Sequence, residues 1–548
     1  MACHDDQVDA VTAVPQPRNE PVLTYAPGSP ERARVEEALK AVAAETADIT
    51  LTVAGEQRGG SGEELVVRAP HRHDLVLARG RAASTEQTSA AIDAALAAAP
   101  AWRELSFDAR AAVFLRAADL LAGPQRDYSN AVTMLGQSKT VHQSEIDAVC
   151  ELVDFWRWNV HFAREILATQ PISVPGQWNR TDHRPLEGFV YAVTPFNFTS
   201  IAANLPTAPA LMGNTVVWKP STTQLLSAQA SMRLLEAAGL PPGVINLVPG
   251  AGPEASAAVL PHPALAGIHF TGSTATFSAL WRGVADNLSS YRTYPRLVGE
   301  TGGKDFVLAH PSADPAALRT ALIRGAFEYQ GQKCSAASRA FVPRSVWERM
   351  GEDLLAETAS LPMGDVADFS NFLGAVIDER AFIKLRNAIG RARDGSSTRI
   401  LVGGECDDSE GWFVRPTIVA TDDPTNEVLC TEYFGPLLGV FVYEDREWTD
   451  VLRLVDTGTP YGLTGAVFAN DRAAVEQASA ALRFTAGNFY VNDKPTGAVV
   501  GQQPFGGSRA SGTNDKAGSP LNLLRWLSPR SIKETLVPPT EWRYPHLG

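Results

Sequence analysis

The stretch EYQGQKCSAASR, residues 328–339, surrounds one thiol, Cys334, with small and polar residues. A structural cysteine usually packs among larger apolar side chains, where it behaves as a small hydrophobic residue. The thiolate is the nucleophilic form of cysteine, and a free thiol has a pKa of about 8.5. A nearby cation such as Lys333, or a helix end, would favour the thiolate, and the small neighbours leave space for a substrate. The pattern favours a nucleophilic Cys334 over an inert buried thiol.

A candidate general base, Glu300, precedes a Gly-Gly turn in the stretch LVGETGGKD, residues 297–305. A carboxylate at the end of a strand, beside a flexible turn, can accept a proton from a water molecule or from a thiol. Together, Cys334 and Glu300 predict covalent catalysis by the thiol, assisted by the carboxylate.

The elements that must position these residues alternate between strands and helices. Strand-like runs between residues 189 and 310 lie at 189–194, 214–220, 243–250 and 266–272. A second alternation follows residue 310, with helices at 314–330 and 345–360 and strands at 339–343, near 416–420 and near 438–443. This pattern predicts two α/β domains with parallel, doubly wound sheets, which bind ligands at the carboxyl ends of their strands.

Three further segments have their own patterns. Residues 86–170 have apolar residues at helical spacing, and one of the helices is expected to stop at Gly123-Pro124. Residues 1–30 are polar and contain prolines, which predicts an arm or a loose start. Residues 169–186 could form a long loop or a projecting hairpin, and the alternation after each proline favours the hairpin.

Composition excludes several classes of function. The 548 residues have a net charge of -13, which argues against nucleic acid or anionic lipid as a main partner. The 5 cysteines include no CxxC pair, which suits a reducing cytoplasm, and the acidic N-terminus does not resemble a signal peptide. No segment is apolar enough to span a membrane, and His71 and His73 have no partners at metal-ligand spacing.

Several motifs occur in the order typical of one enzyme family. They are TPFNF (194–198), VVWKPS (216–221), FTGS (270–273), GETGGKD (299–305), GQKCSAASR (331–339), EYFGP (432–436) and PFGGSRASG (504–512). From about residue 85 to the C-terminus the chain resembles the aldehyde dehydrogenase superfamily. The resemblance implies that Cys334 attacks an aldehyde and that Asn197 and the Cys334 N–H stabilise the oxyanion. Hydride transfer to NAD would leave a thioester, which Glu300 hydrolyses by activating water.

The resemblance also implies the cofactor site. Lys219 would bind the adenosine ribose and Glu432 the nicotinamide ribose, while Gly272 and Ser273 open the helix that faces the pyrophosphate. Ser221 and Phe434 complete the expected cofactor-binding residues. Thr222 stands where many NAD-preferring relatives have glutamate, so NAD is expected and NADP is an alternative cofactor.

The stretch GAVVGQQPFGGSRASGTNDKAG, residues 497–518, further resembles the 1-pyrroline-5-carboxylate dehydrogenases. This resemblance implies oxidation of L-glutamate γ-semialdehyde, the second step of proline breakdown. Gly497 and Ala498 would bind the substrate α-carboxylate through backbone N–H groups, with help from Ser335. Ala498 replaces an expected serine, so one hydroxyl donor is missing. Phe198 and Phe505 would enclose the aliphatic chain, and Glu151 could recognise the α-amino group or be a solvated helix carboxylate.

The fold class implied is α/β, with a Rossmann-type NAD-binding domain, an α/β catalytic domain and a small β oligomerisation flap. The expected boundaries are 1–30 for an N-terminal arm, 31–167 and 187–301 for the NAD-binding domain, 302–519 for the catalytic domain, and 168–186 and 520–548 for the flap. The flap segments are expected to pair across a subunit interface, giving a homodimer or a higher homo-oligomer. Proline oxidation would be done by a separate proline dehydrogenase.

The sequence leaves four alternatives to consider. An aldehyde dehydrogenase for another small aldehyde would use the same residues, and one that transfers the acyl group to coenzyme A would not need Glu300. A cysteine hydrolase would need a histidine near Cys334, which the sequence does not identify. A non-catalytic relative is disfavoured because Asn197, Glu300 and Cys334 are all present.

Overall fold

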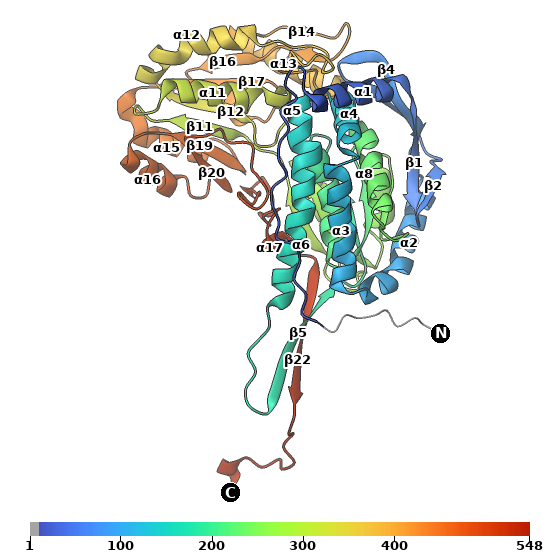
Figure 1. The fold of residues 1–548 in the computed structure, drawn as a ribbon. Helices are drawn as coiled ribbons and strands as arrows, with labels where there is room; N and C mark the ends of the chain where they lie inside the picture. Colours follow the sequence, from blue (N-terminus) through green and yellow to red (C-terminus); the bar gives the residue numbers. More distant parts are fainter. Residues whose placement is uncertain (1–9) are drawn as a thin grey trace.

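The computed structural model describes residues 10–548, which fold around two large sheets (Figure 1). The strands of the first sheet are Ala47–Val53 (β1), Glu56–Gly59 (β2), Glu64–Ala69 (β3), Arg72–Arg81 (β4), Phe189–Val193 (β6), Thr215–Lys219 (β7), Ile245–Leu247 (β8), Leu265–Thr271 (β9) and Arg296–Glu300 (β10). Their order is β10-β9-β6-β7-β8-β1-β4-β3, with β2 beside β1. Strands β6 to β10 are parallel to one another, so their carboxyl ends meet at one edge.

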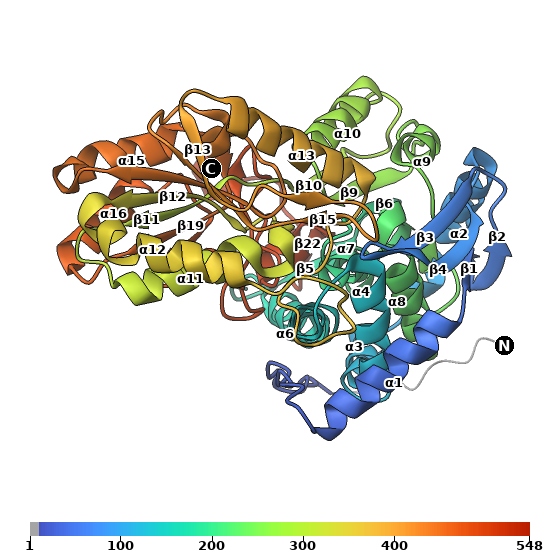
Figure 2. The ribbon, with the colours of Figure 1, turned by 90° about the horizontal axis from the view of Figure 1, so that it is seen from above.

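The strands of the second sheet are Asp305–Ala309 (β11), Ala337–Pro343 (β12), Thr398–Val402 (β13), Thr417–Thr421 (β16), Leu437–Tyr443 (β17), Thr464–Phe468 (β19) and Asn488–Val491 (β20). Their order is β13-β16-β17-β12-β11-β19-β20, and all neighbours are parallel except β13 and β16. The two sheets lie side by side when the molecule is seen from above (Figure 2). Residues 301–304 join β10 of the first sheet to β11 of the second.

The predicted α/β fold class is confirmed, and its sequence signal has a simple cause. Strands β6, β7 and β11 are buried at every residue, because helices cover both faces of the sheets. The apolar runs of these strands are therefore continuous and easy to recognise in the sequence. The four strand runs that we predicted between 189 and 272 correspond to β6, β7, β8 and β9.

Helices surround both sheets. Around the first sheet lie Pro30–Ala44 (α1), Thr85–Glu104 (α2), Phe107–Ala122 (α3), Arg126–Gln137 (α4), Val141–Ser144 (α5), the π-helix Glu145–Glu151, Leu152–Ala168 (α6), Thr199–Leu211 (α7), Leu225–Ala237 (α8), Gly252–Val259 (α9) and Thr274–Asp286 (α10). Around the second lie Pro315–Phe327 (α11), Arg344–Ser360 (α12), Glu379–Asp394 (α13), Glu427–Cys430 (α14), Trp448–Thr457 (α15) and Arg472–Ala481 (α16). Helix α3 ends at Ala122, immediately before the predicted Gly123-Pro124 stop.

The hairpin predicted for residues 169–186 is wrong. Only Gln177–Pro185 (β5) is a strand, and its partner is Leu527–Thr535 (β22) near the C-terminus of the same chain. All nine residues of β5 pair with β22, while Pro171 and Pro175 in the preceding segment have no N–H to offer a ladder. The two-stranded ribbon projects from the body of the molecule (Figure 1).

The predicted N-terminal arm falls partly outside the described residues, which begin at residue 10. Residues 10–29 are extended and make hydrogen bonds to α6 and to the π-helix, so this part is not a loose start. Across residues 10–548, no helix is long and apolar enough to cross a membrane. The same residues contain no group of three or more His, Cys, Asp or Glu side chains that could hold a metal ion.

Candidate active site

Cys334 lies in the turn between helix α11 and strand β12. Tyr329 and Gln330 in this turn have left-handed backbone angles, with φ of 51° and 54°. The Gln330 side-chain amide donates to the backbone carbonyls of Ser138 (3.0 Å) and Ala375 (2.6 Å). These buried hydrogen bonds hold the strained turn, and with it the backbone that presents the Cys334 thiol.

The electrostatic environment of Cys334 opposes ionisation. Burial raises the pKa of the thiol well above its ordinary value, and the carboxylates of Glu300, Asp305 and Glu432 raise it further. In this form of the protein the thiol is therefore protonated near neutral pH. A nucleophilic attack by Cys334 requires a group that accepts the thiol proton.

The sequence suggested that Lys333 or a helix end lowers the pKa of the Cys334 thiol, and neither does so in the structure. The ammonium group of Lys333 is buried and pairs with Glu328, 3.1 Å from its carboxylate. The short segment before Cys334, Glu328–Gly331, is not a regular helix, because Tyr329 and Gln330 have left-handed backbone angles, so it presents no helix N-terminus to the thiol. The prediction that Lys333 or a helix end activates the thiol is wrong for this reason.

Three cavities meet at Cys334. The largest, of ≈ 450 Å³, contains the residues predicted to bind the substrate. The second, of ≈ 40 Å³, also contains Glu300. The third, of ≈ 10 Å³, is lined by Gly303, Glu432 and Phe434. The thiol thus adjoins separate spaces for a substrate, for a general base and for predicted cofactor residues.

Glu300 is the last residue of β10, and it is partly buried beside the loop of residues 504–512. Burial raises the pKa of Glu300 to about 7, although a hydrogen bond from the Gly507 N–H (3.1 Å) and the charge of Lys516 lower it. A carboxylate with a pKa near neutrality is suited to accept a proton and to release it again.

Asn197 lies in the loop between β6 and α7, and its side chain is almost fully buried. Its amide nitrogen donates a 3.1 Å hydrogen bond to the carbonyl of Gln332, two residues before Cys334. A side-chain amide has two N–H donors, so one remains for another acceptor. The structure therefore places Asn197 against the turn that presents the thiol, and its oxyanion role stays a prediction.

All the predicted substrate-binding residues line the cavity of ≈ 450 Å³; they are Ser335, Gly497, Ala498, Phe198, Phe505 and Glu151. The Ser335 hydroxyl donates to Thr496 Oγ1 (2.8 Å), beside Gly497, whose φ of +95° requires glycine. Glu151 is not a solvated helix carboxylate, because burial raises its pKa to about 8 and its Oε2 accepts from Ser200 Oγ (3.0 Å).

Sequence reasoning missed several residues of this cavity. Lys333 and Lys494 bring two cationic side chains to it, and His142 lies in its wall. Asn19, Glu20 and Val22 of the N-terminal segment also line it. Lys494 lies three residues before Gly497 and Lys333 directly precedes Cys334, so the sequence carried a signal for both lysines. The remaining residues come from distant segments that only the fold brings together.

The predicted cofactor residues fall into two groups. One group lies at the carboxyl edge of the first sheet: Lys219 is the last residue of β7, Ser221 follows it, and Gly272 and Ser273 follow β9. These residues do not line the cavities around Cys334. Glu432 and Phe434 precede β17 of the second sheet and do line one of them. The Glu432 carboxylate accepts from the Gly303 N–H (2.8 Å), in the link between the sheets.

The sheet edge fits a bound dinucleotide. Lys219 is buried, and burial lowers its pKa to about 8, with no carboxylate among the described residues contributing to the shift. A buried cation without a counter-ion suits a polar or anionic ligand. Ser273 caps α10 by accepting from the Thr276 N–H (3.1 Å), and Phe277 is buried and stacks on Phe270.

The two large sheets bring a cysteine, a carboxylate and an amide close together, beside a sheet edge suited to a dinucleotide. This arrangement is typical of an oxidoreductase with a covalent cysteine mechanism. Residues 57–532 match the aldehyde dehydrogenase family, and the chain belongs to this family.

Several enzymes are similar in sequence to this chain over almost its whole length. The bovine (Bos taurus) mitochondrial delta-1-pyrroline-5-carboxylate dehydrogenase is 50% identical over 97% of this chain and 94% of its own. The crystal structure of the Mycobacterium tuberculosis delta-pyrroline-5-carboxylate dehydrogenase bound with NAD is 63% identical, with a TM-score of 0.96, over 99% of this chain and 100% of its own. A Thermus 1-pyrroline-5-carboxylate dehydrogenase with bound NAD is 30% identical, with a TM-score of 0.89, over 96% and 100% of the two chains.

The similarity begins earlier than residue 85, where we placed its start from the motifs. The family match begins at residue 57, and the bovine relative aligns with 97% of this chain. The reason is structural, because β1 to β4 complete the first sheet although their residues carry no catalytic motif.

Proposed function

We propose that this protein oxidises L-glutamate γ-semialdehyde, the open form of 1-pyrroline-5-carboxylate, to L-glutamate with NAD as hydride acceptor. The observation that carries the proposal is the single cavity that brings Cys334 together with Gly497, Ala498 and Ser335. A nucleophile for the aldehyde and donors for a carboxylate therefore line one space. The names of the similar proteins support the same substrate and cofactor.

In the first half of the reaction, the Cys334 sulfur attacks the aldehyde carbon and the thiol loses its proton. Glu300 can accept that proton, because burial raises its pKa to about 7. Asn197 and the backbone N–H of Cys334 would donate to the oxyanion, and each such donor typically lowers a barrier by about 3 kcal/mol. NAD supplies a hydride acceptor, so the carbon bound to Cys334 leaves this half of the reaction as a thioester.

In the second half, water attacks the thioester and releases L-glutamate from Cys334. Glu300 would take a proton from the water, in a cavity that it shares with Cys334. The overall reaction consumes one aldehyde, one water and one NAD, and it yields the carboxylate, reduced NAD and two protons. Lys219, Ser221, Gly272, Ser273, Glu432 and Phe434 would hold the cofactor.

The domain boundaries belong to the same proposal. The NAD-binding domain would consist of residues 31–167 and 187–301, and the catalytic domain of residues 302–519. The sheets support this division, because β10 ends at Glu300 and β11 begins at Asp305. Residues 168–186 and 520–548 would form a flap, and β5 and β22 within it pair in one chain.

We also propose a homodimer or higher homo-oligomer in the cytoplasm, supplied with substrate by a separate proline dehydrogenase. Exposed apolar side chains on and beyond the ribbon, including Trp178, Leu536 and Trp542, support contact with a second copy. Light scattering tests the assembly, and a monomer at micromolar concentration would contradict it.

The function is tested with the purified full-length protein and a panel of aldehydes, each with NAD and with NADP. We expect L-glutamate γ-semialdehyde to exceed butanal in kcat/KM by at least about 10²-fold, a modest ratio because Ala498 supplies no hydroxyl. Mass spectrometry identifies glutamate as the product. Equal efficiency on the two aldehydes would leave the family assignment standing and overturn the substrate.

A further inference from the structure

The N-terminal segment, defined here as residues 10–29, is extended, yet it is held closely by the first unit of the fold. In Figure 1 its dark-blue trace runs alongside α6. Such a segment has no hydrogen bonds of a helix or sheet to order it, so side-chain contacts must do so. Its contacts lie on α4, on the π-helix and on α6, and the π-helix and α6 also line the substrate cavity.

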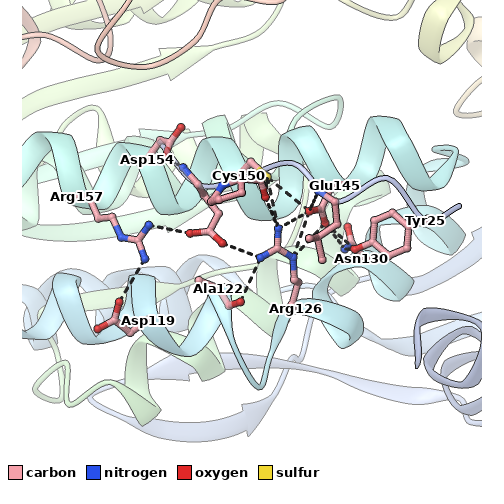
Figure 3. Close-up of polar contacts among 12 residues, drawn as sticks. Tyr25, Asp119, Ala122, Arg126, Asn130, Glu145, Cys150, Asp154 and Arg157 are labelled. Carbon is pink, nitrogen blue, oxygen red and sulfur yellow. Dashed lines mark hydrogen bonds and ion pairs between the residues drawn. The ribbon is translucent and has the colours of Figure 1, made fainter. Parts of the chain in front are cut away.

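The central contact of the N-terminal segment is the fully buried carboxylate of Glu145, at the start of the π-helix. It accepts hydrogen bonds from the Leu23 N–H (3.0 Å) and the Tyr25 hydroxyl (2.7 Å), and it pairs with the Arg126 guanidinium (Figure 3). Burial alone would raise the pKa of Glu145, but the hydrogen bonds from Arg126, Leu23 and other donors outweigh it and lower the pKa. The carboxylate stays charged and keeps the segment in place.

A second carboxylate, Glu20, belongs to the N-terminal segment itself. It pairs with Arg126 on α4 (2.7 Å) and with Arg157 on α6 (2.8 Å), and its backbone N–H donates to Asp154 (2.7 Å). Two ion pairs and a charge-assisted hydrogen bond therefore fix residue 20 at the wall of the substrate cavity.

Asn19, which directly precedes Glu20, uses both of its side-chain polar atoms to bridge helix α6 and the loop of residues 494–503. Its Nδ2 donates to Asp154 Oδ2 on α6 (2.8 Å) and to the carbonyl of Val500 (2.8 Å). Its Oδ1 accepts from Gln502 Nε2 (3.0 Å). Asn19 thereby ties helix α6 to the loop of residues 494–503.

The conformation of the loop of residues 494–503 depends on contacts with other segments of the chain. Gly497 and Gly501 both have left-handed backbone angles, with φ of +95° and +81°. A Cβ atom on Gly501 would lie 2.5 Å from the Trp158 ring of α6, so the loop packs directly on this helix. Small shifts of Val500 relative to α6 would move the N–H groups of Gly497 and Ala498, which are proposed to hold the substrate carboxylate.

We infer that Asn19 is a positioning residue that sets the selectivity of the enzyme for aldehydes carrying an α-carboxylate. It acts by fixing residues 500–502 against α6, and with Glu20 and Val22 it forms one wall of the substrate cavity. The N-terminal segment is thus part of the substrate site. The inference rests on the proposed function, because it takes the 494–503 loop as the carboxylate-binding element.

The test compares the Asn19→Ala variant with the wild type on L-glutamate γ-semialdehyde and on butanal. We expect KM for the semialdehyde to rise about tenfold with kcat within about twofold, because two partly buried hydrogen bonds of ordinary strength and one exposed hydrogen bond are lost. For butanal, kcat/KM should stay within about twofold. The matched control is Thr12→Ala, which removes another polar contact of the same segment, with Asp108 and Arg164, away from the cavity.

A second variant separates positioning from general loss of structure. Gln502→Ala removes the partner of Asn19 Oδ1 and should also raise KM for the semialdehyde. If the two residues act through one contact, the double variant will be only slightly worse than Asn19→Ala alone. Equal losses for both aldehydes, or the same selectivity loss in Thr12→Ala, would overturn the inference while the proposed function stands. A wild type without preference for the semialdehyde would overturn the proposed function, and the inference with it.

Discussion

The backbone N–H of Gly507 donates a 3.1 Å hydrogen bond to Oε1 of Glu300 and joins the loop of residues 504–512 to the end of β10. Burial raises the pKa of Glu300 to about 7, and without this hydrogen bond and the charge of Lys516 it would be higher still. The contact therefore keeps the carboxylate near the balance between its two protonation states. A general base needs such a balance, because it must accept a proton in each turnover and release it again.

The first prediction concerns the pH dependence of turnover. A carboxylate accepts a proton only when ionised, so the rate of thioester hydrolysis should rise with pH through about 7 and then level off. Between pH of about 6 and about 8 we expect an increase of about tenfold in kcat, as for a single ionisation. Steady-state kcat measured across this range checks the prediction, and a flat profile would contradict it where hydrolysis limits the rate.

Glu300→Gln separates the two proton transfers assigned to Glu300. If the carboxylate acts mainly on water, the variant should release a burst of reduced cofactor of roughly one per active site, followed by slow turnover. Rapid mixing with absorbance detection measures the burst. The control is Glu534→Gln on the exposed ribbon, which should behave as wild type. Loss of the burst would show that Glu300 is also required to accept the thiol proton, as proposed for the first half of the reaction, in which the raised pKa of Cys334 makes a proton acceptor necessary.

Cys334→Ala should abolish oxidation of every aldehyde while leaving cofactor binding and thermal stability nearly unchanged. The thiol is the only side-chain group of residue 334 that can form the covalent intermediate, and alanine fits the same turn without a clash. Cys406→Ala is the matched control, because this free cysteine lies on Cys406–Asp407 (β14), away from the three cavities around Cys334. Turnover by the Cys334→Ala variant at a normal rate would exclude the covalent mechanism.

The sequence alone was sufficient for the parts of the site that depend on local pattern. Cys334 among small residues and Glu300 before a Gly-Gly turn could both be identified, because each follows a strand or helix with a clear apolar run. The resemblance added Asn197 and the substrate residues, and the structure places Ser335, Gly497 and Ala498 around one cavity.

Other features depend on contacts between distant segments, which no local pattern encodes. The partner of β5 is β22, more than 300 residues later in the chain, so a hairpin was the natural but wrong interpretation of residues 169–186. The pKa of Cys334 depends on three carboxylates that only folding brings near it. Asn19 and Glu20 looked like part of a polar arm, because their partners are on α4, on α6 and in the 494–503 loop.

Glu145→Gln should destabilise the fold strongly, because it leaves the buried guanidinium of Arg126 without its main counter-ion. Breaking a buried ion pair from one side typically costs about 3–5 kcal/mol. The control is Asp127→Asn, which breaks the more exposed pair with Arg34 (3.0 Å) and should cost less than about 1 kcal/mol. Urea unfolding at neutral pH measures both free energies of unfolding, and equal values would contradict the prediction.

The same variant has a pH signature with a defined sign. The pKa of Glu145 is lowered in the folded state, so its contribution is fully present above the pKa of an unfolded glutamate, about 4.3. That contribution is lost as the pH falls through the lower folded-state pKa. The stability difference between wild type and Glu145→Gln should therefore shrink in acid, and a difference that grows in acid would contradict the assigned charge state.

Gly497→Val should impair the enzyme selectively for the carboxylate-bearing substrate. Gly497 has a φ of +95°, which a β-branched residue adopts only with strain, and a Cβ atom there would lie 3.2 Å from Lys494 Nζ. The loop must shift, and the N–H groups of residues 497 and 498 move with it. We expect KM for L-glutamate γ-semialdehyde to rise at least about tenfold, while butanal, which has no carboxylate to bind, changes by less than about threefold.

The control for this substitution is Gly239→Val, because Gly239 has nearly the same φ, +97°, and open space around the position of its Cβ. It carries the same backbone strain in the turn after α8, where it does not line the substrate cavity. Steady-state kinetics of both variants on both aldehydes therefore separate strain from loss of carboxylate recognition. If Gly239→Val lost selectivity as Gly497→Val does, or if Gly497→Val lost both activities equally, the 494–503 loop could not be the element that holds the carboxylate.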